Sequence, residues 1–307
     1  PTDLAPLREP PAPPQVATHN FRFSEDYDLY PSGAKTKYKN NVMAIKLLKQ
    51  IELEKRTATP EEQIILARYV GWGGLANAFS STASGWENEY QELKSLLTDV
   101  EYKAAMNSTI TAYYTEPDLI RHIYRALERF GFEGGPDRKI LDPGMGTGNF
   151  YSVPEQFQGS KLFGVELDSI TGRIAKQLYP DADISIMGYE ATKFEDNSFD
   201  VILGNIPFNS VKIYDRRYND LNPYIHDYFF IKSLDLAKPG GIIAFVTSRY
   251  TMDSKDSTAR KHMAERADLL GAIRLPNNAF RANAGTDVVS DIIFLQKRDR
   301  PIDHEPD

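Results

Sequence analysis

A chain of 307 residues that contains no cysteine excludes disulfide frameworks, thiolate zinc sites and any mechanism that needs a cysteine nucleophile. Its composition, 41% hydrophobic and 26% charged, is that of a globular protein, and no apolar run approaches the ~18 residues of a membrane span. The formal net charge of −7 excludes a strongly basic, free-standing DNA-binding domain, so any surface that holds nucleic acid has to be local. Because no signal-peptide pattern opens the chain, we expect a cytoplasmic location and no membrane partner.

Both ends of the chain are polar and rich in proline. Residues 1–20 begin PTDLAPLREPPAPPQ, which is typical of an extended linker, and residues 299–307 form a polar tail. These ends fit two interpretations equally well. The chain is either a module of a longer polypeptide or a complete protein with frayed termini.

Residues 21–108 are predicted to form a helical region. Apolar residues at helical spacing fill 38–56, and Thr59, Pro60 and Glu62 have the pattern of a capped helix start. That helix ends in GWGGLANAF, residues 71–79, and residues 87–104 are predicted to be helical again. We interpret GWGGL as packing between this region and the rest of the chain, rather than as a site.

From residue 109 to residue 298 the pattern alternates between strands and helices. Short apolar runs predict strands at 139–142, 161–167, 182–187, 199–204, 241–247, 269–275 and 288–296. Helices are predicted around 149–157, 169–179, 224–237 and 254–267. The alternation indicates an α/β fold with a seven-stranded, doubly wound sheet. The last two strands have no helix between them, so we expect the last one to be antiparallel.

The segment LDPGMGTGNF, residues 141–150, places three glycines between a predicted strand and a helix. Its G-x-G-x-G spacing is tighter than the dinucleotide pattern G-x-G-x-x-G, and its glycines allow a close approach to a ligand. The next strand ends in GVELD, where the Glu166 carboxylate can accept hydrogen bonds from ribose hydroxyls. A plain strand–helix connection is the alternative for the glycine turn.

The segment LGNIPFNS, residues 203–210, joins an amide to an aromatic ring at the mouth of a strand. The Asn205 side-chain oxygen and the Ile206 carbonyl can accept the two hydrogens of an amino group, and Phe208 can stack on a flat base. Pro207 fixes the turn that aims them. A strand-end turn with Phe208 in the core is the alternative.

These motifs, in this order, resemble those of S-adenosylmethionine-dependent methyltransferases that act on the N6 of adenine in DNA. DPGMGTGNF corresponds to the family's glycine-rich turn, GVELD to its acid after the second strand, and NIPF to its catalytic tetrad. YYTEP, residues 113–117, corresponds to an upstream cofactor element. The resemblance covers residues 109–298 and implies a methyltransferase domain of those bounds.

The resemblance assigns roles residue by residue. It implies that Asn205, Ile206, Pro207 and Phe208 are catalytic. It implies that S-adenosylmethionine is bound by Tyr114, Thr115, Asp142, Gly144, Gly146, Gly148, Asn149, Phe150, Glu166, Leu167 and Glu190. No metal site is predicted. For Thr115 a capping box with Asp118 is the alternative, for Phe150 a place in the core, and for Glu190 an exposed loop.

Two departures from the family pattern bear on these roles. Ile206 replaces the first proline of the tetrad, which keeps the carbonyl but removes some of the rigidity of the turn. Glu116 is inserted before Pro117, so that only Tyr114 and Thr115 carry over from the upstream element.

The segments RYVGWGGLANAF, NIPF and HDYFFIKSLDLAKPGG also resemble the methylase portion of large helicase–methylase proteins of phages and conjugative elements. The expected partner is therefore duplex DNA with a flipped adenine, and a helicase region of a longer chain is a possible second partner. Lys212, Arg216 and Arg217 are candidate phosphate contacts, with a solvated loop as the alternative. KTKYK, residues 35–39, is a second basic cluster, which is likewise either a phosphate contact or an ordinary solvated segment.

The tetrad leaves three functions open. DNA adenine is the expected substrate, whereas the same tetrad also resembles that of enzymes methylating RNA adenine or a protein glutamine amide. A catalytically silent DNA-binding or anti-restriction module would keep the fold without the chemistry. Cytosine C5 methylation is excluded, because it needs a cysteine nucleophile.

Overall fold

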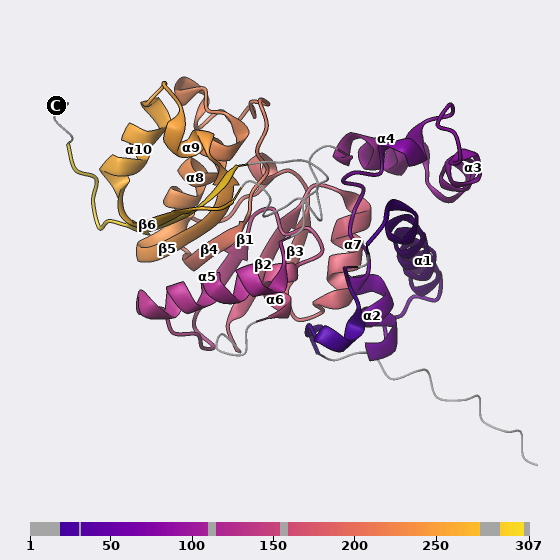
Figure 1. The fold of residues 1–307 in the computed structure, drawn as a ribbon. Coiled ribbons are helices and arrows are strands. Elements are labelled where there is room, and N and C mark those ends of the chain that lie inside the picture. The colour runs from indigo at the N-terminus through magenta and orange to yellow at the C-terminus, as the bar shows by residue number, and fades with distance from the viewer. Residues whose placement is uncertain (1–18, 31, 110–114, 154–158, 277–288, 304–307) are drawn as a thin grey trace, which may run out of the picture.

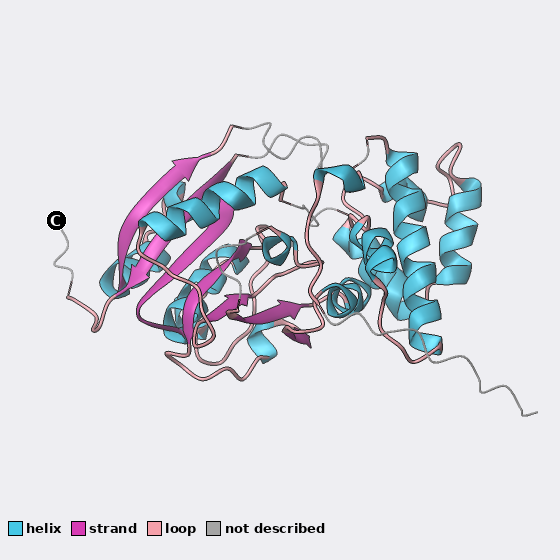
Figure 2. Ribbon diagram, turned by 90° about the horizontal axis from the view of Figure 1, so that it is seen from below, coloured by secondary structure: helices cyan, strands magenta, loops and turns pink. Residues whose placement is uncertain are grey.

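A bundle of helices lies beside an α/β sheet domain (Figures 1 and 2). This arrangement comes from a computed structural model that describes residues 19–30, 32–109, 115–153, 159–276 and 289–303. Tyr114, which the sequence places in the cofactor site, lies outside the described residues. Within them, no helix is both long enough and apolar enough to cross a membrane.

The helical region confirms the predicted helices and divides one of them. Its elements are η1 (Glu25–Tyr27), α1 (Ala34–Leu53), α2 (Pro60–Ala67), η2 (Ala76–Phe79), α3 (Glu87–Leu96) and α4 (Asp99–Ser108). Thr59 and Glu62 form the predicted capping box. Thr98 and Glu101 form a second one, which starts α4 and splits the helix predicted over 87–104. A capping box satisfies two otherwise unpaired amides, so it favours a new helix start there.

Seven strands form one sheet in the order β3-β2-β1-β4-β5-β7-β6. They are β1 (Lys139–Asp142), β2 (Lys161–Glu166), β3 (Asp183–Ile186), β4 (Phe199–Asn205), β5 (Ala237–Ser248), β6 (Ala267–Arg274) and β7 (Ser290–Lys297). The pairs from β3 to β5 are parallel, and β7 is antiparallel to both of its neighbours. The seven-stranded sheet and its antiparallel last strand are thereby confirmed.

Helices cover both faces of the sheet (Figure 1). They are α5 (Pro117–Arg129), α6 (Asn149–Ser152), α7 (Ser169–Leu178), η3 (Tyr189–Ala191), η4 (Asn219–Leu221), α8 (Ile225–Leu236), α9 (Tyr250–Asp253) and α10 (Thr258–Arg266). Alternate residues of the strands enter two cores: Val201 and Leu203 pack with α5, α6 and α7, whereas Ile202 packs with α8 and α10. This period of two is what a sheet buried on both faces requires.

The start of α5 differs from the prediction. Its N-cap residue is Glu116, no side chain caps the helix, and Thr115 is not part of a capping box. The inserted Glu116 moves the helix start one residue along, so that the Thr115 side chain is directed elsewhere. Gly131 adopts a φ of 85° just past the last turn of α5, a conformation in which glycine commonly ends a helix.

The helical region shares a hydrophobic core with the sheet domain, and its helices α1 and α2 contact α7. Gln63 donates from Nε2 to the Gln177 carbonyl over 3.0 Å, and Gln177 accepts from the Ala58 amide over 2.9 Å. Trp72, in contrast, packs against Tyr38, Tyr69 and Phe79 of the helical region itself. Trp72 also belongs to the hydrophobic core that the two regions share, so packing of GWGGL between them stays a prediction.

Candidate functional site

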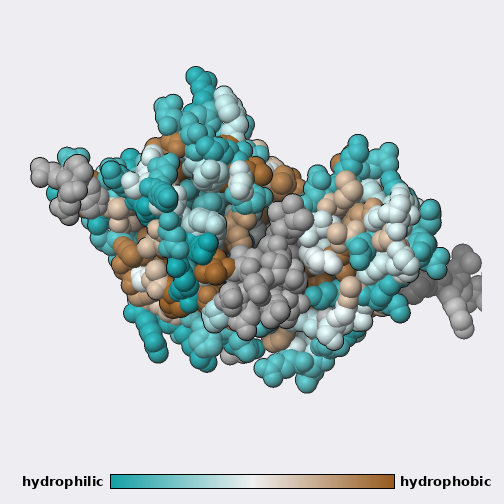
Figure 3. All heavy atoms as spheres, turned by 45° about the horizontal axis from the view of Figure 1, so that its top comes forward, coloured by the Kyte–Doolittle hydropathy of each residue, from teal (hydrophilic) through white to brown (hydrophobic). Residues whose placement is uncertain are grey.

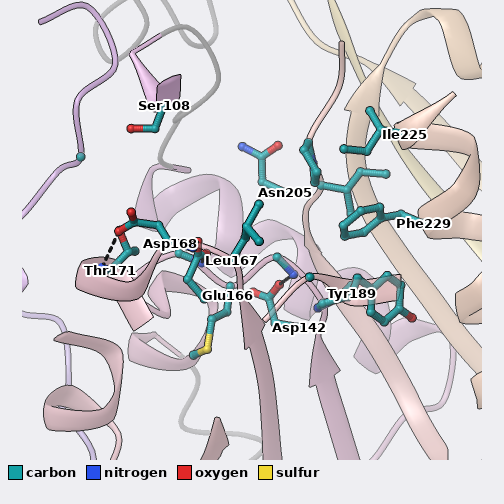
Figure 4. Close-up of a pocket in the computed structure, with 18 of the residues that line it drawn as sticks. Ser108, Asp142, Glu166, Leu167, Asp168, Thr171, Tyr189, Asn205, Ile225 and Phe229 are labelled. Carbon is teal, nitrogen blue, oxygen red and sulfur yellow. Dashed lines mark hydrogen bonds between the residues drawn. The ribbon is translucent and has the colours of Figure 1, made fainter. Parts of the chain in front are cut away.

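A cavity of about 570 Å³ opens at the carboxyl ends of β1, β2 and β4. In open α/β sheets, ligands bind outside the carboxyl ends of the strands, where the strand order reverses. Here β1 is followed in the sheet by β4 on one side and β2 on the other. The cavity walls come from the glycine-rich turn, the end of β2, the NIPF turn, α8 and the helical region (Figure 4).

The three glycines of the turn have different reasons to be glycine. Gly148 has a φ of 90°, and a Cβ there would collide with the Tyr179 ring, so packing alone requires it. Gly146 also has a positive φ, 57°. Gly144 lines the cavity, and a Cβ there would lie 3.5 Å from Pro207 Cδ and 3.6 Å from Phe229 Cε1. The first glycine therefore brings the turn into contact with the tetrad.

Glu166 stands at the end of β2 with its carboxylate turned to the backbone. Oε2 accepts from the Gly146 amide over 2.9 Å and Oε1 accepts from the Asp168 amide over 2.8 Å. Each oxygen keeps a second lone pair for a further donor. Burial raises the pKa of this carboxyl to about 7.

Asp142 ends the neighbouring strand β1 and is 1% exposed. Its Oδ1 accepts from the Gly144 amide over 3.1 Å. Burial, reinforced by the charge of Glu166, raises the pKa of Asp142 to about 8. The cavity floor is thus lined by two carboxyls whose protonated, neutral forms are favoured by burial, and a cationic ligand would favour their ionised forms.

Thr115 is 3% exposed and lines the cavity. Its hydroxyl has no hydrogen-bond partner among the described residues. Nearby, Asn149 donates from Nδ2 to the Tyr30 hydroxyl over 3.0 Å. A buried hydroxyl without a partner costs free energy, so Thr115 is a candidate to bind a ligand that completes it.

Phe150 and Glu190 each lie at the cavity and also have the surroundings that were the alternative to a cofactor role, the core for Phe150 and an exposed position for Glu190. Phe150 is 3% exposed and belongs to the core, although it also lines the cavity. Glu190 is exposed on η3 and lines the cavity as well.

Two apolar side chains, Leu167 and Met187, are 76% and 40% exposed at the same wall. Such exposed apolar groups at a cavity wall are suited to cover a flat ring.

The NIPF turn compensates for its missing proline. Ile206 is 1% exposed, packs in the core beside α8, and donates its amide to the Val246 carbonyl over 3.1 Å. A proline has no amide hydrogen for this bond. The turn is therefore tied to β5 by a hydrogen bond and a buried side chain, where the family pattern uses a rigid ring.

The residues after β4 form a partly apolar chamber at one end of the cavity. Phe208 is partly exposed and lines the cavity, so it is not a core residue. Val211, Ile213, Ile225 and Phe229 complete the lining. Figure 4 shows Ile225 and Phe229 grouped on one side of Asn205, with Leu167, Glu166 and Asp142 on the other. The chamber and the acidic floor thus meet at Asn205.

The helical region supplies a wall that sequence reasoning missed. Tyr69, Gly71 and three residues of α4, Ala104, Asn107 and Ser108, line the cavity. Buried Asn41 holds the turn before Trp72, because it donates to the Gly71 carbonyl over 2.6 Å and accepts from the Val70 amide over 2.9 Å. The GWGGL segment is the only signal in the sequence that pointed here, and we had assigned it to packing.

The three cations proposed for DNA contact differ in their surroundings. Lys212 and Arg216 are exposed. Arg217 makes two hydrogen bonds to Asp196, over 2.8 and 2.7 Å, and pairs with Asp235 over 2.8 Å. In the second basic cluster, Lys35 pairs with Glu89 and lies over the Trp86 ring. Arg217 and Lys35 thus have structural partners. Hydrophilic residues are spread over the face that Figure 3 shows.

The strand order, the glycine-rich turn after β1 and the tetrad after β4 define a methyltransferase domain. A family model described as N-6 DNA Methylase matches residues 100–305, two thirds of the sequence. The chain belongs to this family.

Comparisons with known proteins agree with this class. Defense against restriction protein B of Escherichia phage P1 is 28% identical over 265 residues, which are 84% of this chain and 10% of that protein. The chain therefore spans about a tenth of the length of this curated relative. Among solved structures, a modification subunit of a putative type I restriction enzyme from Vibrio vulnificus YJ016 has a TM-score of 0.52 at 16% identity, over 92% of this chain and 78% of that one.

A putative class I S-adenosylmethionine-dependent methyltransferase from Listeria monocytogenes has a TM-score of 0.50 at 17% identity. The alignment covers 89% of this chain and 91% of that one. At such identities the two structures show a shared fold, and the site has to be argued from its own residues.

Proposed function

We propose that this chain transfers a methyl group from S-adenosylmethionine to the exocyclic N6 of adenine in DNA, by base flipping and direct in-line transfer. The observation that carries the proposal is the junction at Asn205, where an acidic, hydroxyl-binding half of one cavity meets an aromatic half. Family membership supports methyl transfer, and the choice of adenine N6 rests on the junction.

The residues of the acidic half fit the cofactor. The Glu166 carboxylate keeps acceptor capacity for ribose hydroxyls, and Leu167 and Met187 present exposed apolar surface for an adenine ring. The Thr115 hydroxyl offers an unused hydrogen-bonding group. When bound, S-adenosylmethionine supplies a methyl group on a positively charged sulfur. Asp142 and Glu166 line this half of the cavity, and the ionised form of either carboxyl would stabilise such a charge.

The residues of the aromatic half fit a flipped base. Asn205 and the Ile206 carbonyl accept the two amino hydrogens, which pulls electron density toward the nitrogen as it becomes tetrahedral. Phe208 stacks on the ring, and Pro207 holds both in place. Since the amino nitrogen loses its proton only after it has become cationic, no strong base is required. The two halves of the cavity orient the reactants toward each other, and orientation of this kind supplies much of the remaining acceleration.

A second candidate has one specific observation in its favour. The phage P1 relative is named for defence against restriction. A chain with that role and no catalysis would need the fold, but not an open cavity with an unpaired Thr115 hydroxyl. We therefore place methyl transfer first and treat a silent anti-restriction module as the alternative. A helicase region in a longer chain stays a prediction.

Analysis of DNA from a host without adenine methylation tests the proposal. After expression of the chain, plasmid DNA is digested to nucleosides and analysed by mass spectrometry, and a second portion is sequenced for modified positions. N6-methyladenine is expected in DNA from cells with the wild-type chain and absent with Asn205→Ala. Methylated RNA adenine or methylated glutamine, without modified DNA, would move the activity to another substrate.

A further inference from the structure

A buried lysine lies under the cavity, in the middle of α8. Lys232 is 6% exposed, and its ammonium donates to the Tyr189 carbonyl over 2.6 Å. Its nearest carboxylate is that of Asp215, 3.7 Å from Nζ to Oδ2. Burial lowers the pKa of Lys232, and the charges of Asp215 and Glu190 act against this effect. Keeping a cation here costs desolvation energy that an apolar side chain of the same size would avoid.

The two partners of Lys232 belong to two different segments that reach the cavity, and the Tyr189 ring itself packs against Phe229 with 4.9 Å between centroids. Tyr189 begins η3 and precedes Glu190, whose side chain lines the half assigned to the cofactor. Asp215 lies in the segment after the tetrad, and Val211 and Ile213 of that segment line the half assigned to the base. The Lys232 ammonium therefore links the Tyr189 turn to the Asp215 segment, two parts of the cavity wall that are separated in the sequence.

Neighbouring residues of α8 strengthen the same link. The Tyr228 hydroxyl donates to Asp215 Oδ2 over 2.6 Å, and the Tyr189 hydroxyl lies 3.0 Å from the Ser233 hydroxyl. One helix thus holds both segments through hydrogen bonds. The distance from Lys232 Nζ to Asp215 Oδ2 is longer than a normal hydrogen bond, so the two charges attract each other without a direct hydrogen bond. A small movement of either segment changes the energy of the pair.

We infer that Lys232 is a positioning residue that couples cofactor binding in one half of the cavity to adenine binding in the other. The inference rests on the proposed function, since it needs both ligands. Cofactor contact at Glu190 orders the Tyr189 turn, Lys232 is drawn with its carbonyl, and the Asp215 segment is held in the position that receives the base. Coupling of this kind is reciprocal, so DNA should tighten cofactor binding by the same factor.

Calorimetric titration of the full chain measures this coupling. S-adenosylhomocysteine is titrated with and without a short duplex that carries adenines in A·A mismatches, which lowers the cost of flipping. For the wild type we expect the duplex to tighten binding by about 5-fold or more, the lower end of typical coupling. For Lys232→Met we expect the ratio of the two dissociation constants to fall close to one.

Lys238→Met is the matched control. Lys238 is also ion-paired to an aspartate, Asp200, over 2.8 Å, but it is partly exposed and pairs with β4 rather than with the Tyr189 or Asp215 segment. Its removal should leave the ratio unchanged. If Lys232→Met does not fold, Asp215→Asn carries the test, because it removes the charge. Asp215 accepts from Tyr228 at Oδ2 and from the Arg217 amide at Oδ1, and the single amide oxygen of the variant keeps one of these two bonds. Asp215→Asn should also lower the ratio.

The possible outcomes distinguish a failure of the coupling by Lys232 from a failure of the proposed methyl transfer. A wild type that does not bind S-adenosylhomocysteine contradicts the proposed function. A wild type that binds both ligands with a ratio of one, or variants at Lys232 and Asp215 that keep the wild-type ratio, overturn the inference alone. A purely structural role would weaken both dissociation constants of Lys232→Met equally, and the ratio would not move.

Discussion

The carboxylate of Asp142 lies directly against the α-carbon of Gly204, where a side chain of any size would collide with it. Gly204 precedes Asn205 at the end of β4 and has a φ of 149°. Two neighbouring strands thus place the buried Asp142 carboxyl beside the residue that precedes the NIPF turn. The position of the tetrad depends on this contact.

Gly204→Ala should therefore push Asn205 and Asp142 apart. We expect the free energy of unfolding to fall by about 1–3 kcal/mol, as for other overpacked cores, and methylation to fall with it. Gly85→Ala is the control, since Gly85 has a φ of 76° but nothing within 4 Å of an added Cβ. Chemical denaturation and a methylation assay of both variants make the comparison. An alanine at 204 that leaves both quantities unchanged would contradict the contact.

The raised pKa of Asp142 predicts a pH dependence of stability. Its folded pKa of about 8 lies above the ordinary value, so the folded state holds a proton that the unfolded state releases. Stability should be highest below the ordinary pKa and should fall as the pH rises toward 8, by up to about 1.4 kcal/mol per pH unit. Asp142→Asn should flatten this slope. Denaturation curves at a series of pH values test it, and an equal slope in both proteins would place the proton elsewhere.

Thr115→Val should separate ligand binding from stability. Removal of a buried hydroxyl without a partner should raise the free energy of unfolding by about 1 kcal/mol, while cofactor affinity falls. Thr247→Val is the opposite control, because its buried hydroxyl lies 3.0 Å from that of Thr251 and its loss should destabilise the fold. Thermal unfolding and calorimetry give both quantities. A Thr115→Val variant with full affinity would remove Thr115 from the cofactor site.

The surroundings of the three cations predict different effects on DNA binding. Lys212→Ala with Arg216→Ala should lower the log–log salt slope by about two, equally for all sequences, with cofactor affinity unchanged. Arg217→Ala should change the slope little, because Asp196 and Asp235 already neutralise it, and should cost less than about 1 kcal/mol of stability. Fluorescence titrations at several salt concentrations decide this. Equal slopes for the double variant and the wild type would place the phosphate contacts outside this loop.

Local patterns were enough to predict the sheet. The strands alternate with helices and their apolar runs are continuous, so period and turn residues located all seven, and the missing helix before the last one indicated its direction. Gly144, Glu166 and Asn205 were found because strand ends in a parallel sheet meet at one edge.

Contacts between distant segments were not predictable in this way. Nothing local to Lys232 indicates that Asp215 and Tyr189 surround it, and nothing local to Tyr69 or Ser108 places them at the cavity. Ile206 was identified as a departure from the family pattern, but its bond to Val246 depends on the register of β4 and β5. The capping box that was the alternative for Thr115 does not form, because the inserted Glu116 takes the N-cap position.

The most direct test of adenine methylation uses purified chain, radioactive S-adenosylmethionine and unmethylated DNA in a single-turnover reaction. The wild type should transfer the label to DNA, where nucleoside analysis should find it on the N6 of adenine. Asn205→Ala should bind the cofactor within a few-fold of wild type and react more slowly by a factor on the order of 10²–10³. Labelled adenine at an equal rate in Asn205→Ala, or no labelled adenine from a wild type that binds the cofactor, would contradict the assignment.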